Sequence, residues 1–223
     1  LSSTLPIMPS TIGKLNDTQT RRRVIRDYLS NAGLNETCTY TLVNKDYIEM
    51  PFKVGEAIAL ALPLSEERKY IRNSLMNSLM ETLAYNEAHY NTNVNLFEIS
   101  SLYAKDNVHK EHLAILLSGN LSESKVLKNE VKNSFYVIKG LVMTLLSKLG
   151  YEKGRLTVEE NTLDTTHFHP YQSCVIMMNK RPLAILGKVH PRYAQKYKVS
   201  DCSYCEMDLS LLEGTKGAKI KAV

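Results

Sequence analysis

The chain has 223 residues, of which 43% are hydrophobic and 23% charged, values typical of an ordinary globular protein. A chain of this length buries roughly 70–75% of its unfolded surface, so its folding requires neither disulfides nor metal. The net charge of +5 favours polyanionic partners only mildly, and an ordinary basic surface is the simpler interpretation. Because no apolar run approaches the roughly 20 residues that cross a membrane and no signal peptide is recognisable, we expect a cytoplasmic protein without membrane contacts.

The four cysteines, at positions 38, 174, 202 and 205, do not predict a metal site. Cys202 and Cys205 have the two-residue gap of a zinc or redox motif, but zinc needs two further close ligands and no second pair exists. Their stretch alternates like a strand, so the two thiols should point to opposite faces. We therefore expect reduced structural thiols, as in a cytosolic protein.

The first 62 residues predict a linker, two helices and two strands. Pro6, Pro9 and Gly13 interrupt any period in residues 1–16, which indicates a linker leading into a core domain at residues 17–212. A helix follows at residues 17–32 and ends at Gly33. The remaining elements of this part are a strand at 36–43, a short helix at 45–50 and a strand at 55–62.

Three arginines, Arg21, Arg22 and Arg23, lie in the first half of the predicted helix. Positive charge near a helix N-terminus opposes the macrodipole, so these residues do not stabilise the helix. They are candidates for contact with RNA phosphates or with an acidic partner, and a solvated helix face is the alternative.

The stretch from residue 62 to 103 predicts a long helix and then a strand. Leucine and methionine recur at spacings of three and four from Leu75 to Leu83, and Ser74 stands where a helix N-cap is expected. The strand over residues 94–99 carries one acid, Glu98, among apolar residues. A buried acid is costly unless it is paired, so we expect Glu98 to be a satisfied polar residue at a former cleft.

Downstream, the clearest helix spans residues 134–149 and has an apolar face. Residues 120–133 are polar and predict a loop, and residues 213–223 predict a tail. The other predicted elements are strands at 113–117, 155–159, 172–179, 182–189 and 203–209 and a helix at 191–198. Because hairpins replace strict strand–helix alternation, the fold class is α+β, with helices packed on an antiparallel sheet.

Several ordered motifs resemble the core of the β subunit of bacterial phenylalanyl-tRNA synthetase. They are Pro63-Leu-Ser, Arg72-Asn-Ser-Leu, Leu96-Phe-Glu-Ile, a Lys139-Gly pair, His169-Pro170 and Gly187-Lys-Val-His-Pro191. The resemblance covers nearly the whole chain and implies a class II aminoacyl-tRNA synthetase fold, with an antiparallel sheet of six or seven strands flanked by helices. It assigns His169-Pro170 to a turn, and we expect His190 to pack or to cap a helix.

Class II synthetases hold ATP with two arginines, because a guanidinium binds phosphate oxygens bidentately. One arginine lies in a strand motif and the other follows a late glycine-rich motif. The matching strands here, at residues 95–100 and 203–209, contain no arginine. We therefore expect no catalytic, cofactor-binding or metal-binding residue in this chain. The resemblance assigns ATP and Mg²⁺ to the whole enzyme and adenylate formation to the α subunit.

The function implied by the resemblance is a non-catalytic core that docks the α subunit in an (αβ)₂ assembly, which attaches phenylalanine to tRNA(Phe). The matching interface is the first helix and strand, with Val24, Tyr28 and Tyr40 as candidate contacts. One alternative is a basic RNA-binding module using Arg21–Arg23 and the region of Lys180 and Arg181. A second is an autonomous ligase whose phosphate contacts come from Arg68, Arg72 or Arg155.

Overall fold

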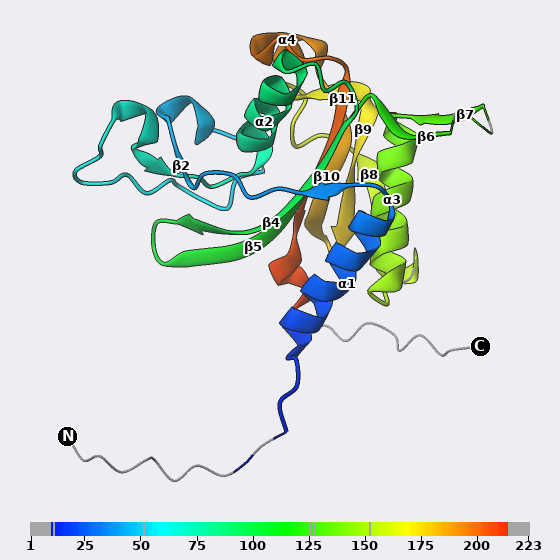
Figure 1. The fold of residues 1–223 in the computed structure, drawn as a ribbon. Helices are drawn as coiled ribbons and strands as arrows, with labels where there is room; N and C mark the ends of the chain where they lie inside the picture. Colours follow the sequence, from blue (N-terminus) through cyan, green and yellow to red (C-terminus); the bar gives the residue numbers. More distant parts are fainter. Residues whose placement is uncertain are drawn as a thin grey trace.

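A seven-stranded sheet forms the centre of the protein (Figure 1). The computed structural model describes residues 10, 12–50, 52–124, 126, 128–151 and 153–213. The helices in this part are α1 (Asp17–Asn31), α2 (Met76–Ala88), α3 (Phe135–Lys148) and α4 (Pro191–Tyr197). Short 3₁₀ turns add η1 (Lys45–Tyr47), η2 (Glu66–Arg68), η3 (Lys153–Arg155) and η4 (Leu209–Leu212). None of the described helices is long and apolar enough to span a membrane.

The strand order of the main sheet is β1-β4-β5-β11-β10-β9-β8. All neighbours are antiparallel except the short parallel pair β1–β4. These strands are β1 (Asn35–Glu36), β4 (Val94–Ala104), β5 (Val108–Ser118), β8 (Leu156–Glu160), β9 (Phe168–Met178), β10 (Arg181–Val189) and β11 (Cys202–Asp208). The predicted α+β class and seven-stranded sheet are therefore confirmed, with one parallel pair at the edge.

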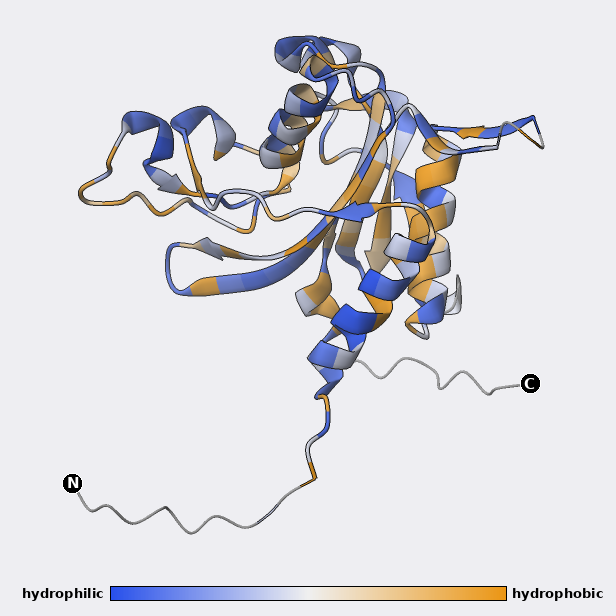
Figure 2. Cartoon of the chain, viewed as in Figure 1, coloured by the Kyte–Doolittle hydropathy of each residue, from blue (hydrophilic) through white to orange (hydrophobic). Residues whose placement is uncertain are grey.

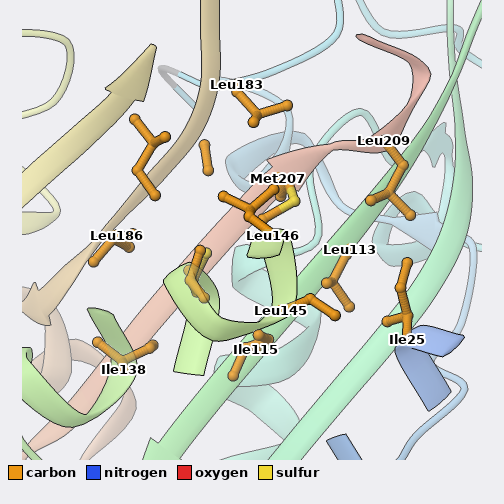
Figure 3. Close-up of a cluster of buried hydrophobic side chains, with 14 of the residues drawn as sticks. Ile25, Leu113, Ile115, Ile138, Leu145, Leu146, Leu183, Leu186, Met207 and Leu209 are labelled. Carbon is orange, nitrogen blue, oxygen red and sulfur yellow. The ribbon is translucent and has the colours of Figure 1, made fainter. Parts of the chain in front are cut away.

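Helices α1 and α3 pack on one face of the sheet. In Figure 3, Leu146 of α3 lies close to Met207, and Leu145 of α3 and Ile25 of α1 lie on either side of Leu113. Fully burying one such side chain contributes about 1.5–3 kcal/mol. The predicted helix at 134–149 is confirmed, and the Ser134 hydroxyl accepts a hydrogen bond from the amide of Val137 at 3.3 Å as its N-cap.

The other face is covered by α2 and α4 and by the segment between α1 and α2. Figure 1 places α2 and the region around β2 across the sheet from α3. The second buried cluster joins Leu79 and Leu83 of α2 to Tyr204 of β11. Figure 2 shows apolar colour along the sheet and mostly polar colour on α1. The sheet therefore separates two cores, and the site described below lies in the second.

The predicted strand at 36–43 is wrong, because the structure has two separate pieces. Asn35 and Glu36 form β1, whereas Leu42 and Val43 form β2, which pairs with β3 (Tyr70–Ile71). Between them, the amide and hydroxyl of Thr39 bind the Glu98 carboxylate, at 3.3 and 2.7 Å. Side-chain bonds thus replace the strand ladder here.

Two other sequence predictions are corrected. Residues 55–62 form only one isolated bridge, between Ala59 and Tyr70, because alanine and glycine offer little side chain to pack in a sheet. The predicted loop at 120–133 contains a hairpin of β6 (Asn120–Ser124) and β7 (Asn129–Lys132). Its mostly polar strands lack the apolar alternation that would have indicated them.

The predicted linker and tail lie mainly outside the described residues. Residues 10 and 12–16 have no helix or strand, and residues 1–9 and 11 are not described. At the other end, Glu213 is described and residues 214–223 are not. The predicted boundaries of the core at 17 and 212 therefore stay predictions.

Candidate functional site

Two buried acids lie in one row across the second face of the sheet. Glu98 of β4 and Glu206 of β11 both pair with Ala114 of β5, which stands between them. Ala114 belongs to the α2-side cluster, so strand alternation places both acids on that side. Glu98 is 2% exposed and Glu206 is 1% exposed. Buried carboxylates need partners, and each acid has a separate set.

Glu98 is paired with Arg72, which lies just after β3. Nη2 of Arg72 donates to Oε1 of Glu98 at 2.5 Å and to the Ser100 hydroxyl at 2.9 Å. Nη1 donates to the hydroxyl of Thr39, and the Arg72 amide donates to the carbonyl of Thr41 at 3.0 Å. With 2% of its surface exposed, Arg72 has no free face for a phosphate.

Glu206 accepts hydrogen bonds from three strands or segments. Nδ1 of His112 lies 2.7 Å from Oε1 of Glu206, and the hydroxyls of Tyr204 and Ser74 both lie 2.8 Å from Oε2. Burial raises the pKa of Tyr204 well above its usual value, and the neighbouring carboxylate raises it further, so the phenol stays a donor. The acid therefore fastens the start of α2 to the sheet.

Ser74 is not the N-cap residue that its position in the sequence predicts. The helix begins at Met76, with Leu75 preceding it, and the Ser74 hydroxyl donates to Glu206. The same hydroxyl oxygen lies 3.4 Å from the amide of Met76, so some capping contact remains. The tertiary bond to a buried acid outweighs the local cap because that carboxylate has no access to water.

The other two arginines considered for phosphate contacts do not converge with Arg72. The guanidinium carbon of Arg68 lies 5.2 Å from the centre of the Tyr40 ring, and its Nη1 donates to the carbonyl of Leu42 at 3.0 Å. Arg155 precedes β8, the edge strand farthest from β4 in the sheet. In this arrangement Arg68 and Arg155 do not join Arg72 to form a two-arginine phosphate site near Glu98 and Glu206.

The candidate interface residues of α1 lie on the opposite side of the sheet from Tyr40. Tyr28 packs against the first core, and its hydroxyl donates to the carbonyl of Leu141 in α3 at 3.2 Å. Burial raises the pKa of Tyr28 above its usual value. Val24 is half-buried, and Tyr40 is 64% exposed. A substitution of Tyr40 would therefore test a docking role without removing a core contact, whereas a substitution of Tyr28 would also remove one.

Two of the three clustered arginines have acidic partners within the chain. Nη2 of Arg21 lies 3.6 Å from Glu213, and Nε of Arg22 lies 2.5 Å from Glu111. Arg23 is exposed. Lys180 and Arg181 are exposed at the β9–β10 turn.

Cys202 and Cys205 lie in the two cores, and His190 and His169 lie at a helix cap and in a strand. Cys202 belongs to the second core and Cys205 to the first, as the strand period predicts. The described residues contain no group of three or more His, Cys, Asp or Glu that could hold a metal. His190 caps α4 by accepting from the amide of Arg192 at 3.2 Å. His169 lies within β9, where residues 169–172 bulge between the pairs Ser173–Gly187 and Phe168–Val189.

A groove that the sequence did not reveal runs along the exposed side of α2. Its volume is about 680 Å³, and its wall contains four tyrosines and two charged side chains. They are Tyr40, Tyr47, Tyr85, Tyr197, Arg68 and Glu81. The residues come from two helices, two 3₁₀ turns and the segment between β1 and β2. No single sequence period connects them, so only the repeated tyrosines around residues 40–47 and 85 hinted at it.

Comparison with known proteins gives one consistent result. The model of the phenylalanyl tRNA synthetase beta chain CLM domain matches residues 1–209. Phenylalanine–tRNA ligase beta subunits from Listeria innocua and Bacillus licheniformis are each 33% identical over 220 residues, which cover 96% and 94% of this chain. The chain spans only 27% and 26% of the length of these two relatives.

Solved structures show the same fold at low identity. A pyrrolysyl tRNA synthetase from Desulfitobacterium hafniense, PylSc, has a TM-score of 0.63 at 15% identity, over 90% of this chain and 70% of that one. A second structure of pyrrolysyl-tRNA synthetase from the same organism has a TM-score of 0.61 at 14% identity, over 92% of this chain and 73% of that one. Together, the family match and the sheet described above show that this chain belongs to the phenylalanyl-tRNA synthetase beta chain CLM domain family.

Proposed function

We propose that this chain is the non-catalytic, synthetase-like core of a phenylalanyl-tRNA synthetase β subunit, and that it docks the catalytic α subunit. In this assignment the domain contributes to phenylalanine–tRNA ligation through assembly and forms no adenylate itself. The relatives that support it are named as beta subunits of that ligase.

The proposal rests on the α2 side of the sheet, where the buried Arg72 guanidinium is not free to bind phosphate. A nucleotide site of this kind needs guanidinium groups free to bind phosphate. Here Arg72 is 2% exposed and bound to Glu98, and β11, two strands away in the same row, carries a second buried acid, Glu206. Among the described residues, the one guanidinium in this row is already neutralised by Glu98, so an α-phosphate placed here would find no free positive charge.

The same proposal covers the assembly, the cofactors, the substrate and the cellular location of the whole enzyme. The assembly is an (αβ)₂ heterotetramer in the cytoplasm, and it uses ATP and Mg²⁺ to charge tRNA(Phe). The ATP, the Mg²⁺ and the adenylate chemistry belong to the α subunit. The beta-subunit names of the relatives support an α partner, and the α subunit then supplies the phosphate contacts that Arg72 does not provide.

Two measurements on the chain test this function. Mixed with the cognate α subunit, the chain should form a complex whose mass, measured by light scattering after gel filtration, exceeds that of either component. Alone, it should not exchange pyrophosphate into ATP when given phenylalanine. The proposal is contradicted if the chain forms no complex with the α subunit, or if the chain alone exchanges pyrophosphate into ATP above background.

A further inference from the structure

The tyrosine groove along α2 has the composition of a cation-binding surface. Tyr85 of α2 and Tyr40 are 66% and 64% exposed, so part of each side chain is open to a partner. Tyr47 and Tyr197 lie deeper, with ring centres 6.4 Å apart. The hydroxyl of Tyr197 donates to Oδ1 of Asn77 at 2.6 Å, which holds this wall against α2.

One carboxylate in the groove has no counter-charge among the described residues. Oε1 of Glu81 accepts a hydrogen bond from the Tyr47 hydroxyl at 2.7 Å, and the described residues give Glu81 no ion pair. Burial and, after it, the hydrogen bond and charge of Glu81 raise the pKa of Tyr47 to about 12, so this phenol stays a neutral donor. Glu81 is exposed and therefore available to a cation from outside.

The groove already shows the contact that a cation would make. The Arg68 guanidinium lies over the Tyr40 ring at 5.2 Å, within the distance at which a cation is attracted to an aromatic face. Its Nη1 is bound to the Leu42 carbonyl, so it does not reach across to neutralise Glu81 in the described structure. The groove thus holds one occupied cation contact, at Tyr40. Glu81 and Tyr85 keep exposed side chains, although the His89 ring lies against the Tyr85 ring at a centroid distance of 4.2 Å.

Two exposed apolar residues precede Arg68 in the sequence. Leu62 is 93% exposed and Leu64 is fully exposed, in the loop that precedes η2. Interfaces commonly combine aromatic anchors with arginine, and exposed leucines would add apolar area to such a contact. The exposed carboxylate of Glu81 and the exposed tyrosines of the groove therefore suit a basic protein segment better than a free ion.

We propose that the groove receives an arginine or lysine side chain from a segment of the α subunit, with Glu81 as its carboxylate partner and Tyr85 as its aromatic contact. This inference rests on the proposed function, because it names the α subunit as the occupant. The guanidinium or ammonium group lies between Tyr85 and Glu81, and the partner's backbone passes over Tyr40 and the leucine loop.

Binding of the α subunit to charge-matched variants tests the inference. Glu81→Lys should weaken binding by about tenfold in isothermal titration calorimetry, because it removes an attraction and adds a repulsion. Tyr85→Ser should weaken it several-fold. The controls are Glu160→Lys on the β8 edge, with the same change in net charge, and Tyr171→Ser, which removes a tyrosine that is 89% exposed in β9. Both controls should stay within about twofold of wild type, and circular dichroism should show that all four variants fold.

A second probe separates this inference from the function on which it rests. N-acetylarginine amide and its neutral analogue N-acetylcitrulline amide are titrated into the chain, and the Tyr85 ring resonances are followed by NMR. We expect shifts with the arginine compound that Glu81→Gln abolishes. If the α subunit binds but Glu81→Lys behaves like Glu160→Lys, the groove inference is overturned and the function stands. If the α subunit does not bind, the function fails, and equal responses to the two amides then overturn the cation site as well.

Discussion

Removing the buried guanidinium of Arg72 should be one of the most damaging single substitutions in the chain. Arg72→Met leaves the Glu98 carboxylate buried, at 2% exposure, without its ion-pair partner. Breaking a buried pair in this way costs about 3–5 kcal/mol. With a urea dependence of roughly 3 kcal/mol per molar, the midpoint of unfolding should fall by about 1 to 1.7 M.

Two variants decide whether the cost comes from the unpaired charge. Arg72→Met combined with Glu98→Met removes both charges, and replacing a whole buried pair with apolar groups is often nearly neutral. The double variant should therefore recover most of the lost stability. Arg26→Met breaks an exposed pair with Glu36, whose side chains are 44% and 39% exposed, and it should cost about 1 kcal/mol or less.

Urea unfolding followed by circular dichroism measures all three differences. If the double variant is as unstable as Arg72→Met alone, the loss comes from packing and the charge argument is refuted. An Arg72→Met variant that costs no more than Arg26→Met would refute it too, because burial would then add nothing to the pair.

Three further predictions concern the core, a helix cap and the thiols. Leu146→Ala empties a fully buried position in α3 and should lower the free energy of unfolding by about 2–5 kcal/mol in urea. Asn16→Ala removes the N-cap of α1 and should cost about 1 kcal/mol in the same assay, and no change would mean that the cap contributes nothing. At pH 8.5, Cys38 is exposed and should react with a disulfide reagent. Burial raises the pKa of Cys202 to about 12, so that thiol stays protonated and should react only after unfolding, and two fast thiols in the native protein would contradict this.

Elements with a strong apolar period were predictable from the sequence. Helix α3 begins at the predicted cap and ends close to the predicted residue, because its apolar face and Ser134 are local signals. The opposite orientation of Cys202 and Cys205 followed from the strand period alone. Local chemistry is sufficient where the same residues decide both the element and the face that it buries.

The segment from residue 37 to 41 was not predictable in the same way. Its β-branched residues favour a strand, but Thr39 bonds to Glu98, which lies 59 residues away. The sequence indicated that Glu98 needs a partner, because a buried acid is costly alone. It did not identify Arg72, which stood among the candidate phosphate contacts. A partner brought in by a distant segment leaves no periodic signal, and the tyrosine groove was missed for the same reason.

The Arg72–Glu98 pair links the α2 side of the sheet to the groove. Through Thr39 and the carbonyl of Thr41, Arg72 fixes the two neighbours of Tyr40, which forms one wall of the groove. The Arg72–Glu98 pair therefore has two effects. It leaves Arg72 unable to bind a phosphate, and it positions Tyr40 in the groove proposed to bind the α subunit. Arg72→Met should weaken α-subunit binding several-fold even at a temperature where the variant is fully folded, whereas Lys132→Met, which breaks an exposed pair with Glu130 in the β6–β7 hairpin, should not. If the two folded variants bind the α subunit with equal affinity, the Arg72–Glu98 pair has no effect on docking and only stabilises the fold.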